Sequence, residues 1–589
     1  MIRISELKLP LSAITFDPEN HTEFHPEERL RALAAQLLGL APADLGRLQV
    51  FKRSFDARKA DLQAVYIVDL ELTDPGQEAA LLARFDKHPH VGATPDMQWQ
   101  PVGQAPADLA ERPVVVGFGP CGIFAALALA QMGFRPIVIE RGKNVRERTQ
   151  DTWGLWRKRE LMPESNVQFG EGGAGTFSDG KLYSQIKDPR HLGRKVMQEF
   201  VDAGAPAEIL YAAHPHIGTF KLVKVVESIR AQITALGGEV RFSQRVDDVL
   251  LDDADAQGMR RVRGLVVQDL ATGECTELTT SQVVMALGHS ARDTFARLYE
   301  RGVHMEAKPF SVGFRIEHPQ SVIDRARWGR HAGHPLLGAA DYKLVHHAAN
   351  GRAVYSFCMC PGGTVVAATS EPGRVVTNGM SQYSRNERNA NAGMVVAIDP
   401  VDFPHTPEAF AAAFDGQTYG VEHLAPGEFH PLSGIVFQRQ IESRAYVLGG
   451  SNYNAPAQLV GDFLAGRPSA ALGTVEPSYK PGVHLGDLDA ALPAYAIEAM
   501  REALPAFGKK IRGFDMPDAL LTGVETRTSS PLKMGRDESL QSLNTRGLYP
   551  AGEGASYAGG ILSAGVDGIR VAEALARQML GLPVPQNRR

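Results

Sequence analysis

The sequence contains little cysteine and no long apolar run. Four cysteines in a chain of 589 residues cannot build a disulfide framework, so we expect a protein of the reducing cytoplasm. No apolar run approaches the roughly 20 residues that cross a bilayer. The start of the chain also lacks the apolar segment of a secretory signal, so the sequence predicts a cytoplasmic protein without a membrane partner.

Neither sign of charge dominates the composition. The 62 lysines and arginines against 67 acidic residues give a net charge of −5, which argues against a dedicated nucleic-acid surface. The hydrophobic content of 44% is that of an ordinary globular protein. The chain is too long for one hydrophobic core, which predicts two to four domains.

Glycine is abundant, and residues 113–142 use it in a pattern typical of nucleotide-binding folds. The apolar run Val114–Val116 predicts a buried parallel strand, Ile123–Met132 a helix, and Ile137–Ile139 a second strand that ends in Glu140. Between the first strand and the helix lie three glycines at GxGxxG spacing: Gly117, Gly119 and Gly122.

Each part of this unit suits a dinucleotide. The glycines allow a tight turn, close approach of the backbone to a pyrophosphate, and close packing of helix on strand. The helix that starts near Pro120 directs its free N–H groups at the phosphates, and Glu140 can accept hydrogen bonds from ribose hydroxyls. The alternative is a glycine-rich turn in an unrelated α/β unit.

Further glycine-rich segments predict more contacts to the same ligand. The segment Phe169–Lys181 repeats the GxGxxG spacing without a strand before it, and we interpret it as backbone lying against the ligand rather than as a flexible loop. The strand of residues 282–287 ends in a turn with Gly288 and His289, and we expect His289 to have a positional or capping role.

The last glycine-rich segment, Gly547–Gly568, favours FAD over a nicotinamide cofactor. A strand there leads into Gly552 and Glu553, and a helix follows Gly560. The N-terminus of that helix would stabilise the negative charge of a reduced flavin ring. A domain that binds only a nicotinamide cofactor does not need this additional contact.

The rest of the chain divides into modules. We predict a βαββα module over residues 1–96 and a linker over 97–112. An α/β domain would take residues 113–300 and 524–589, with an inserted β-rich α+β cap domain over 301–523 that has little sustained helix. The expected local features are a basic turn at Lys52–Lys59, a hairpin over Val354–Thr369 that turns at Pro361–Gly363, a β-turn at Cys275, and helices at 457–464 and 491–507.

Cys358 and Cys360 stand two residues apart in one of the predicted strands. Side chains at this spacing point to the same face, so the thiols could touch and form a redox dithiol or half of a metal site. Since no further cysteine lies nearby, a four-thiolate zinc site is excluded and we predict no metal. The alternative is that both cysteines are small buried apolar residues.

With these segments the chain resembles the glutathione-reductase-type FAD-binding fold, and more closely a bacterial family of uncharacterised FAD-dependent dehydrogenases. The resemblance runs from about residue 110 to the C-terminus, and implies a three-layer Rossmann-like domain that binds FAD. We expect the FAD to be bound without a covalent bond. It implies that Gly117, Gly119 and Gly122 hold the pyrophosphate, that Glu140 binds the adenosine ribose, and that Glu553 binds the ribityl or pyrophosphate region. Val246 would present its backbone to the adenine. The further FAD contacts that we expect are Arg141, Gly175, Thr176, Ser178, Gly288, Gly552, Gly560 and Ile561.

These features predict an FAD-dependent oxidoreductase that transfers hydride between flavin and an unidentified small organic substrate. The candidate catalytic or pocket residues are Lys181, Arg315, Asn378, Arg527, Cys358 and Cys360, and Arg527 could clamp a carboxylate with two hydrogen bonds. No second strand–GxGxxG–helix unit is present for NAD(P)H, which remains open as an electron donor. The alternatives are a flavin-binding redox sensor or assembly protein, whose residues 1–96 meet a protein partner, and an FAD-linked dithiol enzyme that uses the two cysteines.

Overall fold

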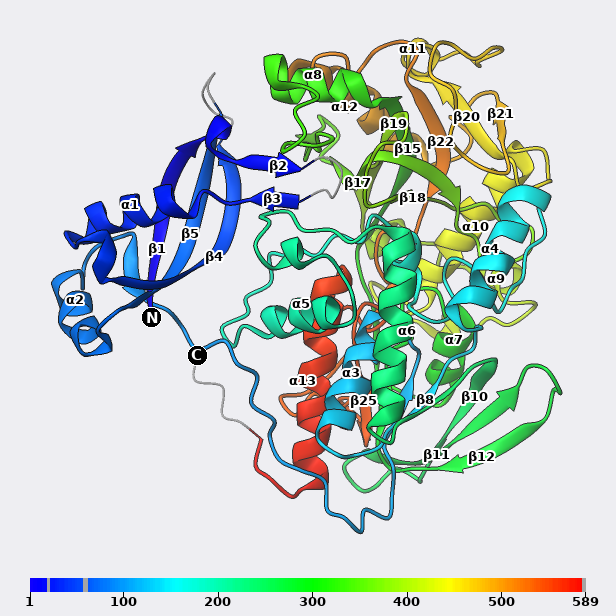
Figure 1. Ribbon diagram of the computed structural model, residues 1–589. Helices are drawn as coiled ribbons and strands as arrows, with labels where there is room; N and C mark the ends of the chain where they lie inside the picture. Colours follow the sequence, from blue (N-terminus) through cyan, green and yellow to red (C-terminus); the bar gives the residue numbers. More distant parts are fainter. Residues whose placement is uncertain (18–21, 57–61, 585–589) are drawn as a thin grey trace.

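The computed structural model describes residues 1–17, 22–56 and 62–584, which form three bodies of secondary structure. In Figure 1 a small N-terminal module lies to one side of a parallel sheet with its helices, and a second, larger sheet lies above that domain. Each body has its own hydrophobic core, and the core of the parallel-sheet domain is divided between the two faces of its sheet.

The N-terminal module is an antiparallel sheet with two helices, and the predicted βαββα order is confirmed. The helix α1 (Glu27–Leu38) packs its buried Leu30, Ala34 and Leu38 against this sheet. Three short strands were not predicted: β2 (Thr15–Asp17), β3 (Thr22–Phe24) and β6 (Val91–Ala93). The strand order is β4 (Leu45–Asp56), β5 (Gln63–Leu72), β1 (Ile2–Pro10) and β6 (Val91–Ala93), with α1 (Glu27–Leu38), α2 (Glu78–Arg84) and the separate pair β2 (Thr15–Asp17) and β3 (Thr22–Phe24).

The predicted basic turn at Lys52–Lys59 is wrong for residues 52–56, and residues 57–59 lie outside the described part of the chain. Residues 52–56 continue β4, because its pairing with β5 extends as far as Asp56 and Gln63. Arg53 is buried, and its backbone N–H donates to Tyr211 O at 2.7 Å. Leu336, which comes from the body of the larger sheet, packs in the core of the module. The module is therefore attached to both other bodies.

Five parallel strands form the central sheet, and the residues of all but the edge strand at 239–241 are buried. The order is β25 (Leu548–Pro550), β13 (Val283–Met285), β7 (Val114–Val116), β8 (Ile137–Ile139) and β9 (Glu239–Arg241). Strands with continuous Val and Ile runs are typical of a parallel sheet covered on both faces. The C-terminal strand β25 pairs beside β13, so two distant parts of the sequence complete one sheet.

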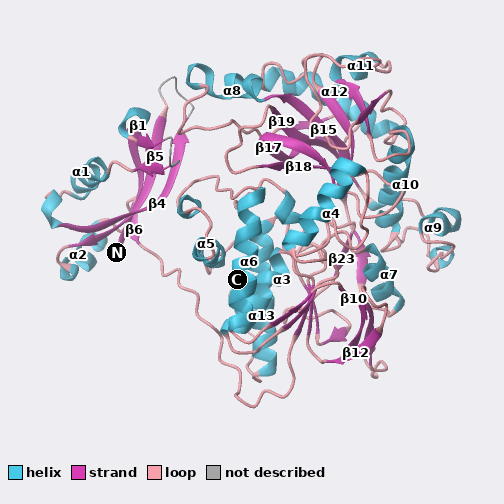
Figure 2. Cartoon of the chain, turned by 45° about the vertical axis from the view of Figure 1, so that its right-hand side comes forward, coloured by secondary structure: helices cyan, strands magenta, loops and turns pink. Residues whose placement is uncertain are grey.

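Helices cover one face of this sheet, and an antiparallel meander with one helix covers the other. Both views show α3, α6 and α13 side by side (Figures 1 and 2). The predicted three-layer arrangement of this domain is therefore present. The helical layer is α3 (Pro120–Gln131), α5 (Leu192–Asp202), α6 (Thr219–Ala235) and α13 (Ile561–Met579). The other layer is β10 (Gln244–Leu251), β11 (Arg260–Asp269), β12 (Cys275–Thr279) and α7 (Arg292–Glu300).

The larger sheet has eight strands, as the β-rich composition of this region predicts. Its pairing is antiparallel except between β20 and β21. The order is β16 (Val345–His347), β17 (Ala353–Ala367), β19 (Asn389–Ile398), β15 (Phe310–Pro319), β22 (Leu520–Glu525), β20 (Ala455–Leu459) and β21 (Val483–Leu485), with β18 (Thr377–Ser381) on β17. Its helices are α8 (Gln320–Trp328), α9 (Pro407–Ala413), α10 (Ser433–Leu448), α11 (Val460–Ala465) and α12 (Ala494–Lys510).

Several local predictions in this region are wrong. The segment Pro361–Gly363 is not a hairpin turn, because β17 continues through it with shifts of register against β19. The expectation of little sustained helix fails, since α10 has 16 residues. The helix predicted at 491–507 is confirmed by α12. The helix predicted at 457–464 is half strand, because Ala455–Leu459 pairs with β22. Cys275 begins the strand β12 rather than lying in a turn.

The remaining segments connect these bodies. Residues 97–112 contain no helix or strand, as expected of a linker, but Trp99 Nε1 donates to Glu573 Oε1 of α13 at 2.9 Å. The predicted domain boundary at 523 falls inside β22. The other elements are α4 (Val145–Lys158), β14 (Met305–Ala307), β23 (Leu532–Met534) and β24 (Thr545–Arg546). Among all described residues, none of the helices combines the length and the apolar character needed to cross a bilayer.

Candidate cofactor site

A cavity of about 380 Å³ lies at the carboxyl ends of the parallel strands, between the central sheet and the larger sheet. We call it the cofactor cavity. The glycine-rich segments, far apart in the sequence, meet around it, and β17 and β22 of the larger sheet supply residues to its wall. The carboxyl edge of an open parallel sheet is where α/β proteins bind ligands. The segments that line it are 116–121, 168–170, 173–175, 178–181, 286–291 and 559–561, with Ala551 and Glu553.

The three glycines of the first turn have different surroundings. Gly117 has a φ of +95°, and a Cβ there would lie 2.3 Å from Ala286 O. A Cβ on Gly122 would lie 1.9 Å from Gly117 O, so this glycine lets α3 pack against the turn. At Gly119 the nearest atom to a Cβ is Gly173 Cα at 3.6 Å. The backbone of Gly119 is therefore unobstructed on the side of the cavity, and a ligand can approach it there.

Two helices begin at the cavity wall. The helix α3 starts at Pro120 directly after Gly119, and α13 starts at Ile561 directly after Gly560. A Cβ at Gly560 would have no atom within 4 Å, so the space before α13 is open. Free N–H groups and the positive end of the helix dipole attract anions at such positions. The arrangement provides two sites for negative groups of one extended ligand.

Glu140, at the end of β8, holds two glycine-rich segments together. Its Oε2 accepts a hydrogen bond from Phe118 N at 2.8 Å, and its Oε1 accepts from Gly142 N at 2.8 Å and Gly170 N at 2.9 Å. A carboxylate has about four lone-pair sites, so acceptor capacity remains for a hydroxyl group in the cavity. Glu140 is thus a structural anchor that also lines the cavity.

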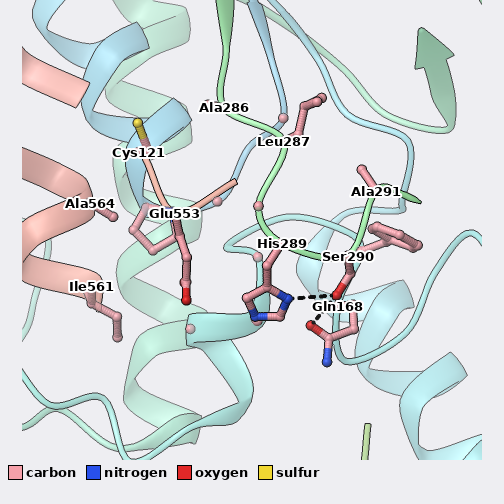
Figure 3. A pocket seen from close by; sticks show the side chains of 18 of the residues that line it. Cys121, Gln168, Ala286, Leu287, His289, Ser290, Ala291, Glu553, Ile561 and Ala564 are labelled. Atoms are coloured by element: carbon pink, nitrogen blue, oxygen red, sulfur yellow. Dashed lines mark hydrogen bonds between the residues drawn. The ribbon is translucent and has the colours of Figure 1, made fainter. Parts of the chain in front are cut away.

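His289 lies in the turn after β13, beside the side chains of Ser290 and Gln168 (Figure 3). Its Nδ1 is 2.9 Å from Ser290 Oγ, which donates to Gln168 Oε1 at 3.2 Å. Burial, with the nearby charges of Arg527 and Arg292, lowers the pKa of His289 to about 3. The imidazole is therefore neutral at physiological pH, which suits the positional role that we predicted.

Two carboxyl groups in the wall, those of the buried Glu525 and the half-buried Glu553, have raised pKa values. Burial raises the pKa of Glu553 to about 7, although Lys308 opposes the shift. Burial likewise raises the pKa of Glu525 to about 7, against the effect of Arg315, whose Nη1 lies 3.5 Å from Glu525 Oε2. With pKa values near 7 both groups would exchange protons near neutral pH, and Figure 3 shows Glu553 among the residues that line the cavity. The cavity wall can therefore donate or accept protons.

The predicted cationic residues already have partners. Arg527 lines the cavity, but its guanidinium donates to Ser290 Oγ at 3.0 Å and to Ser370 Oγ at 2.7 Å, and it pairs with Glu442 at 3.3 Å. A two-point clamp on a carboxylate would have to displace these contacts. Lys181 also lines the cavity, and its Nζ lies 3.3 Å from Asp179 Oδ2. Arg315 is fully buried behind the wall.

Most of the predicted FAD contacts line the cavity. Three do not: Gly122 packs inside α3, the Thr176 hydroxyl donates to Glu171 O at 3.4 Å, and Gly552 N donates to Asp567 Oδ2 at 2.8 Å. Asn378 and Cys358 also line it, whereas Cys360 is buried behind Cys358. The lining residues from the predicted set are Gly117, Gly119, Glu140, Arg141, Gly175, Ser178, Val246, Gly288, Glu553, Gly560 and Ile561.

The prediction missed several polar residues of the wall. Gln168 and Tyr183 flank the second glycine-rich segment, Arg245 precedes Val246, and Glu525 ends β22. Their positions next to predicted contacts were a usable signal. Glu525 lies two residues before the predicted pocket residue Arg527, and the pairing of β22 with β15 brings this strand end to the cavity.

Comparison with known proteins identifies the class. Residues 309–528 match the family described as FAD-dependent protein, C-terminal domain-like, and residues 1–71 match a domain of unknown function. An uncharacterised protein of Clostridium beijerinckii is 45% identical over 539 residues, which are 91% of this chain and 93% of the relative. Within the chain, residues 309–528 are thus a region similar to the C-terminal domain of FAD-dependent proteins. The chain belongs to the same family as the Clostridium protein.

Solved structures offer weaker likenesses. The L-amino acid deaminase from Proteus vulgaris is 13% identical, with 84% of this chain and 98% of that chain covered and a TM-score of 0.33. A flavocytochrome c3 fumarate reductase is 12% identical over 83% of each chain, with a TM-score of 0.32. We draw nothing from similarities this low, and the narrower resemblance to the glutathione-reductase type stays a prediction.

Proposed function

We propose that the protein is an FAD-dependent oxidoreductase that transfers hydride between its flavin and a small organic substrate. The observation that carries this proposal is the meeting of the glycine-rich segments around one cavity, with a wall supplied by a second sheet. The first sheet offers the features that a dinucleotide needs, and the larger sheet closes the cavity where a substrate can reach the cofactor.

The residues present fit FAD. Gly119 and the start of α3 would hold the pyrophosphate, Glu140 the adenosine ribose, and the start of α13 the anionic side of the flavin ring. Bound without a covalent bond, the flavin would supply the hydride chemistry. Glu525 and Glu553, with their raised pKa values, would hold or accept the proton that accompanies a hydride.

The source of electrons is open between the organic substrate and NAD(P)H. Within the described residues, one parallel sheet carries a glycine-rich turn between strand and helix, and FAD would take that turn. A nicotinamide would therefore have to enter the same cavity from the side of the larger sheet.

Anaerobic flavin reduction tests the proposal. The FAD-loaded protein is mixed with NADH, NADPH and a panel of hydroxy acids, amino acids, amines and thiols at saturating concentrations. The visible absorbance band of the oxidised flavin is then followed. We expect at least one class to bleach this band on the timescale of turnover. A flavin that no compound reduces, in protein that stays folded and loaded, would contradict the proposal.

A flavin-binding redox sensor is the second candidate, and one contact favours it. Arg53 of the N-terminal module forms a β-bridge with Ala212, and four residues further on His216 forms a β-bridge with Lys181 in the cavity wall. A protein partner on residues 1–96 would thus be linked to the cavity by a short segment. If the protein is a sensor, we expect that no metabolite reduces the flavin rapidly. We also expect that Arg53→Pro, which removes the bridge to Ala212, changes the flavin spectrum.

A further inference from the structure

Cys358 and Cys360 lie where β17 crosses the wall of the cofactor cavity. Cys358 lines the cavity beside Phe357, and Cys360 is fully buried behind it. The register of β17 against β19 shifts between Phe357 and Cys360, and Cys358 has a φ of +41°. A residue other than glycine in this region is strained, and such strain is concentrated at functional sites.

The irregular backbone brings the two thiols together. Residues i and i+2 of a regular strand are about 6.7 Å apart, which is the upper limit for a disulfide. Here the backbone at Cys358 leaves the extended region, and the two thiols are close enough for each to shift the pKa of the other. The Sγ of Cys360 also lies 3.3 Å from Cys358 O. The pair thus has the proximity that a reversible disulfide requires.

Two cations flank the pair. Arg315 Nη2 lies 3.6 Å from Cys360 Sγ and donates to Cys358 O at 3.0 Å, while Lys181 Nζ donates to Met359 O between the two cysteines. The neighbouring Cys360 thiol, with Lys181 and Arg315, lowers the pKa of Cys358 against the effect of burial. Cys358 and burial raise the pKa of Cys360. The two sulfurs are therefore not equivalent.

We propose that Cys358 and Cys360 form a redox-active dithiol that reduces small-molecule disulfides entering the cavity, with Cys358 as the attacking and Cys360 as the resolving sulfur. This activity goes beyond the proposed hydride transfer, and it stands or falls independently of the identity of the organic substrate.

The exchange balances without another reactant. The Cys358 thiolate attacks one sulfur of the disulfide RS–SR, so that a Cys358–SR bond forms and RS⁻ leaves. The Cys360 thiol gives its proton to the departing RS⁻ and attacks Cys358 Sγ, which breaks the mixed disulfide and releases a second RS⁻. The dithiol is oxidised by two electrons to the Cys358–Cys360 disulfide, and RS–SR is reduced to RSH and RS⁻.

The pH dependence of the attack depends on the charged surroundings of Cys358. Besides Cys360, the titratable and charged groups that face it are Lys181, Arg315, Asp179, Glu525, Glu553 and Tyr183. The cations favour the thiolate, and the ionised carboxylates oppose it. Because Glu525 and Glu553 ionise near pH 7, we expect Cys358 to be thiolate well below that pH.

Reaction with 5,5′-dithiobis(2-nitrobenzoate) tests the pair, and the number of thionitrobenzoates released per chain is measured. The full-length protein is purified and reduced before the reaction. A Cys275→Ser background removes the exposed cysteine on β12, which is remote from the cavity lining. In this background we expect release of two thionitrobenzoates per chain and an intramolecular disulfide by peptide mass. Adding Cys360→Ser should release one and retain one on Cys358, and adding Cys358→Ser should slow the reaction at Cys360. Melting temperatures show that each variant is folded.

Alkylation of the unmutated chain provides a measurement that does not depend on variants. With iodoacetamide at pH 6, we expect Cys358 to react about tenfold faster than Cys275. The lowered pKa of Cys358 makes its thiolate intrinsically less nucleophilic, but the larger fraction of thiolate outweighs this loss. The proposal is overturned if folded Cys360→Ser protein retains no mixed disulfide on Cys358. It is equally overturned if Cys358 reacts no faster than Cys275 at this pH.

Discussion

At the scale of single residues, the glycines of one GxGxxG turn divide between holding the fold and admitting a ligand. Gly117 and Gly122 are surrounded by backbone atoms, whereas the position of a Cβ on Gly119 is free on the side of the cavity. A side chain at Gly119 would occupy the space in which a pyrophosphate meets the backbone. The structure thereby separates two roles that the sequence pattern presents as one.

Gly119→Ala should impair FAD binding and leave the fold intact. Its φ of −79° suits alanine, and losing glycine as the N-cap residue costs less than about 1 kcal/mol. We expect the FAD dissociation constant to rise at least roughly tenfold, about 1.4 kcal/mol, in a titration followed by flavin fluorescence.

Gly122→Ala is the matched control for this substitution. Its new Cβ would lie 1.9 Å from Gly117 O, so the free energy of unfolding should fall by about 1–3 kcal/mol or more. Equal loss of stability in both variants, or unchanged FAD affinity in Gly119→Ala, would contradict the separation of roles.

At the scale of elements, a buried ionic network joins α7 of the parallel-sheet domain to α10 of the larger sheet. Glu442 on α10 accepts from Arg292 Nη2 at 2.6 Å and from Thr526 Oγ1 at 2.7 Å, and it pairs with Arg527 at 3.3 Å. All these side chains are buried. Removing one partner of such a group leaves uncompensated charge, so the network fixes how the two sheets meet at the cavity.

Glu442→Gln should destabilise the protein by about 3–5 kcal/mol near pH 7, measured as the free energy of unfolding in urea. Burial acts to raise the pKa of Glu442, but Arg292 and Arg527 outweigh it and lower the pKa to about 2. A carboxyl with a lowered folded-state pKa stabilises above its unfolded value of about 4.3, and this contribution is lost as the pH falls toward 2.

The difference between the wild type and Glu442→Gln should therefore be constant above about pH 5 and shrink by about 3 kcal/mol between pH 4.3 and 2. The control is Glu498→Gln on α12, an exposed glutamate whose substitution should change stability by less than about 0.5 kcal/mol. If the difference in the free energy of unfolding between the wild type and Glu442→Gln does not vary with pH, the charge of Glu442 does not stabilise the contact between α7 and α10.

At the scale of the whole molecule, the sequence predicted the part of the architecture that depends on local pattern. The run Val114–Val116, the glycines and Glu140 gave the strand, turn and helix of the first unit, and the valines of β13 gave another strand of the same sheet. The convergence of the glycine-rich segments was also predictable, because carboxyl ends of parallel strands share one edge of the sheet.

Features decided by tertiary pairing were not predictable. Pro361–Gly363 has the composition of a turn, yet β17 continues through it because β18 and β19 pair with the strand on both sides. Arg527 has the chemistry of a carboxylate clamp, but Glu442, which lies 85 residues earlier in the chain, already pairs with it.

The central claim is that one FAD binds where these glycine-rich segments meet, and calorimetric titration of the folded, flavin-free protein with FAD measures this most directly. The account predicts saturable binding of one FAD per chain, with a stoichiometry that stays at one while the affinity falls in Gly119→Ala. Protein that is folded by circular dichroism and shows no saturable binding of FAD would contradict the account.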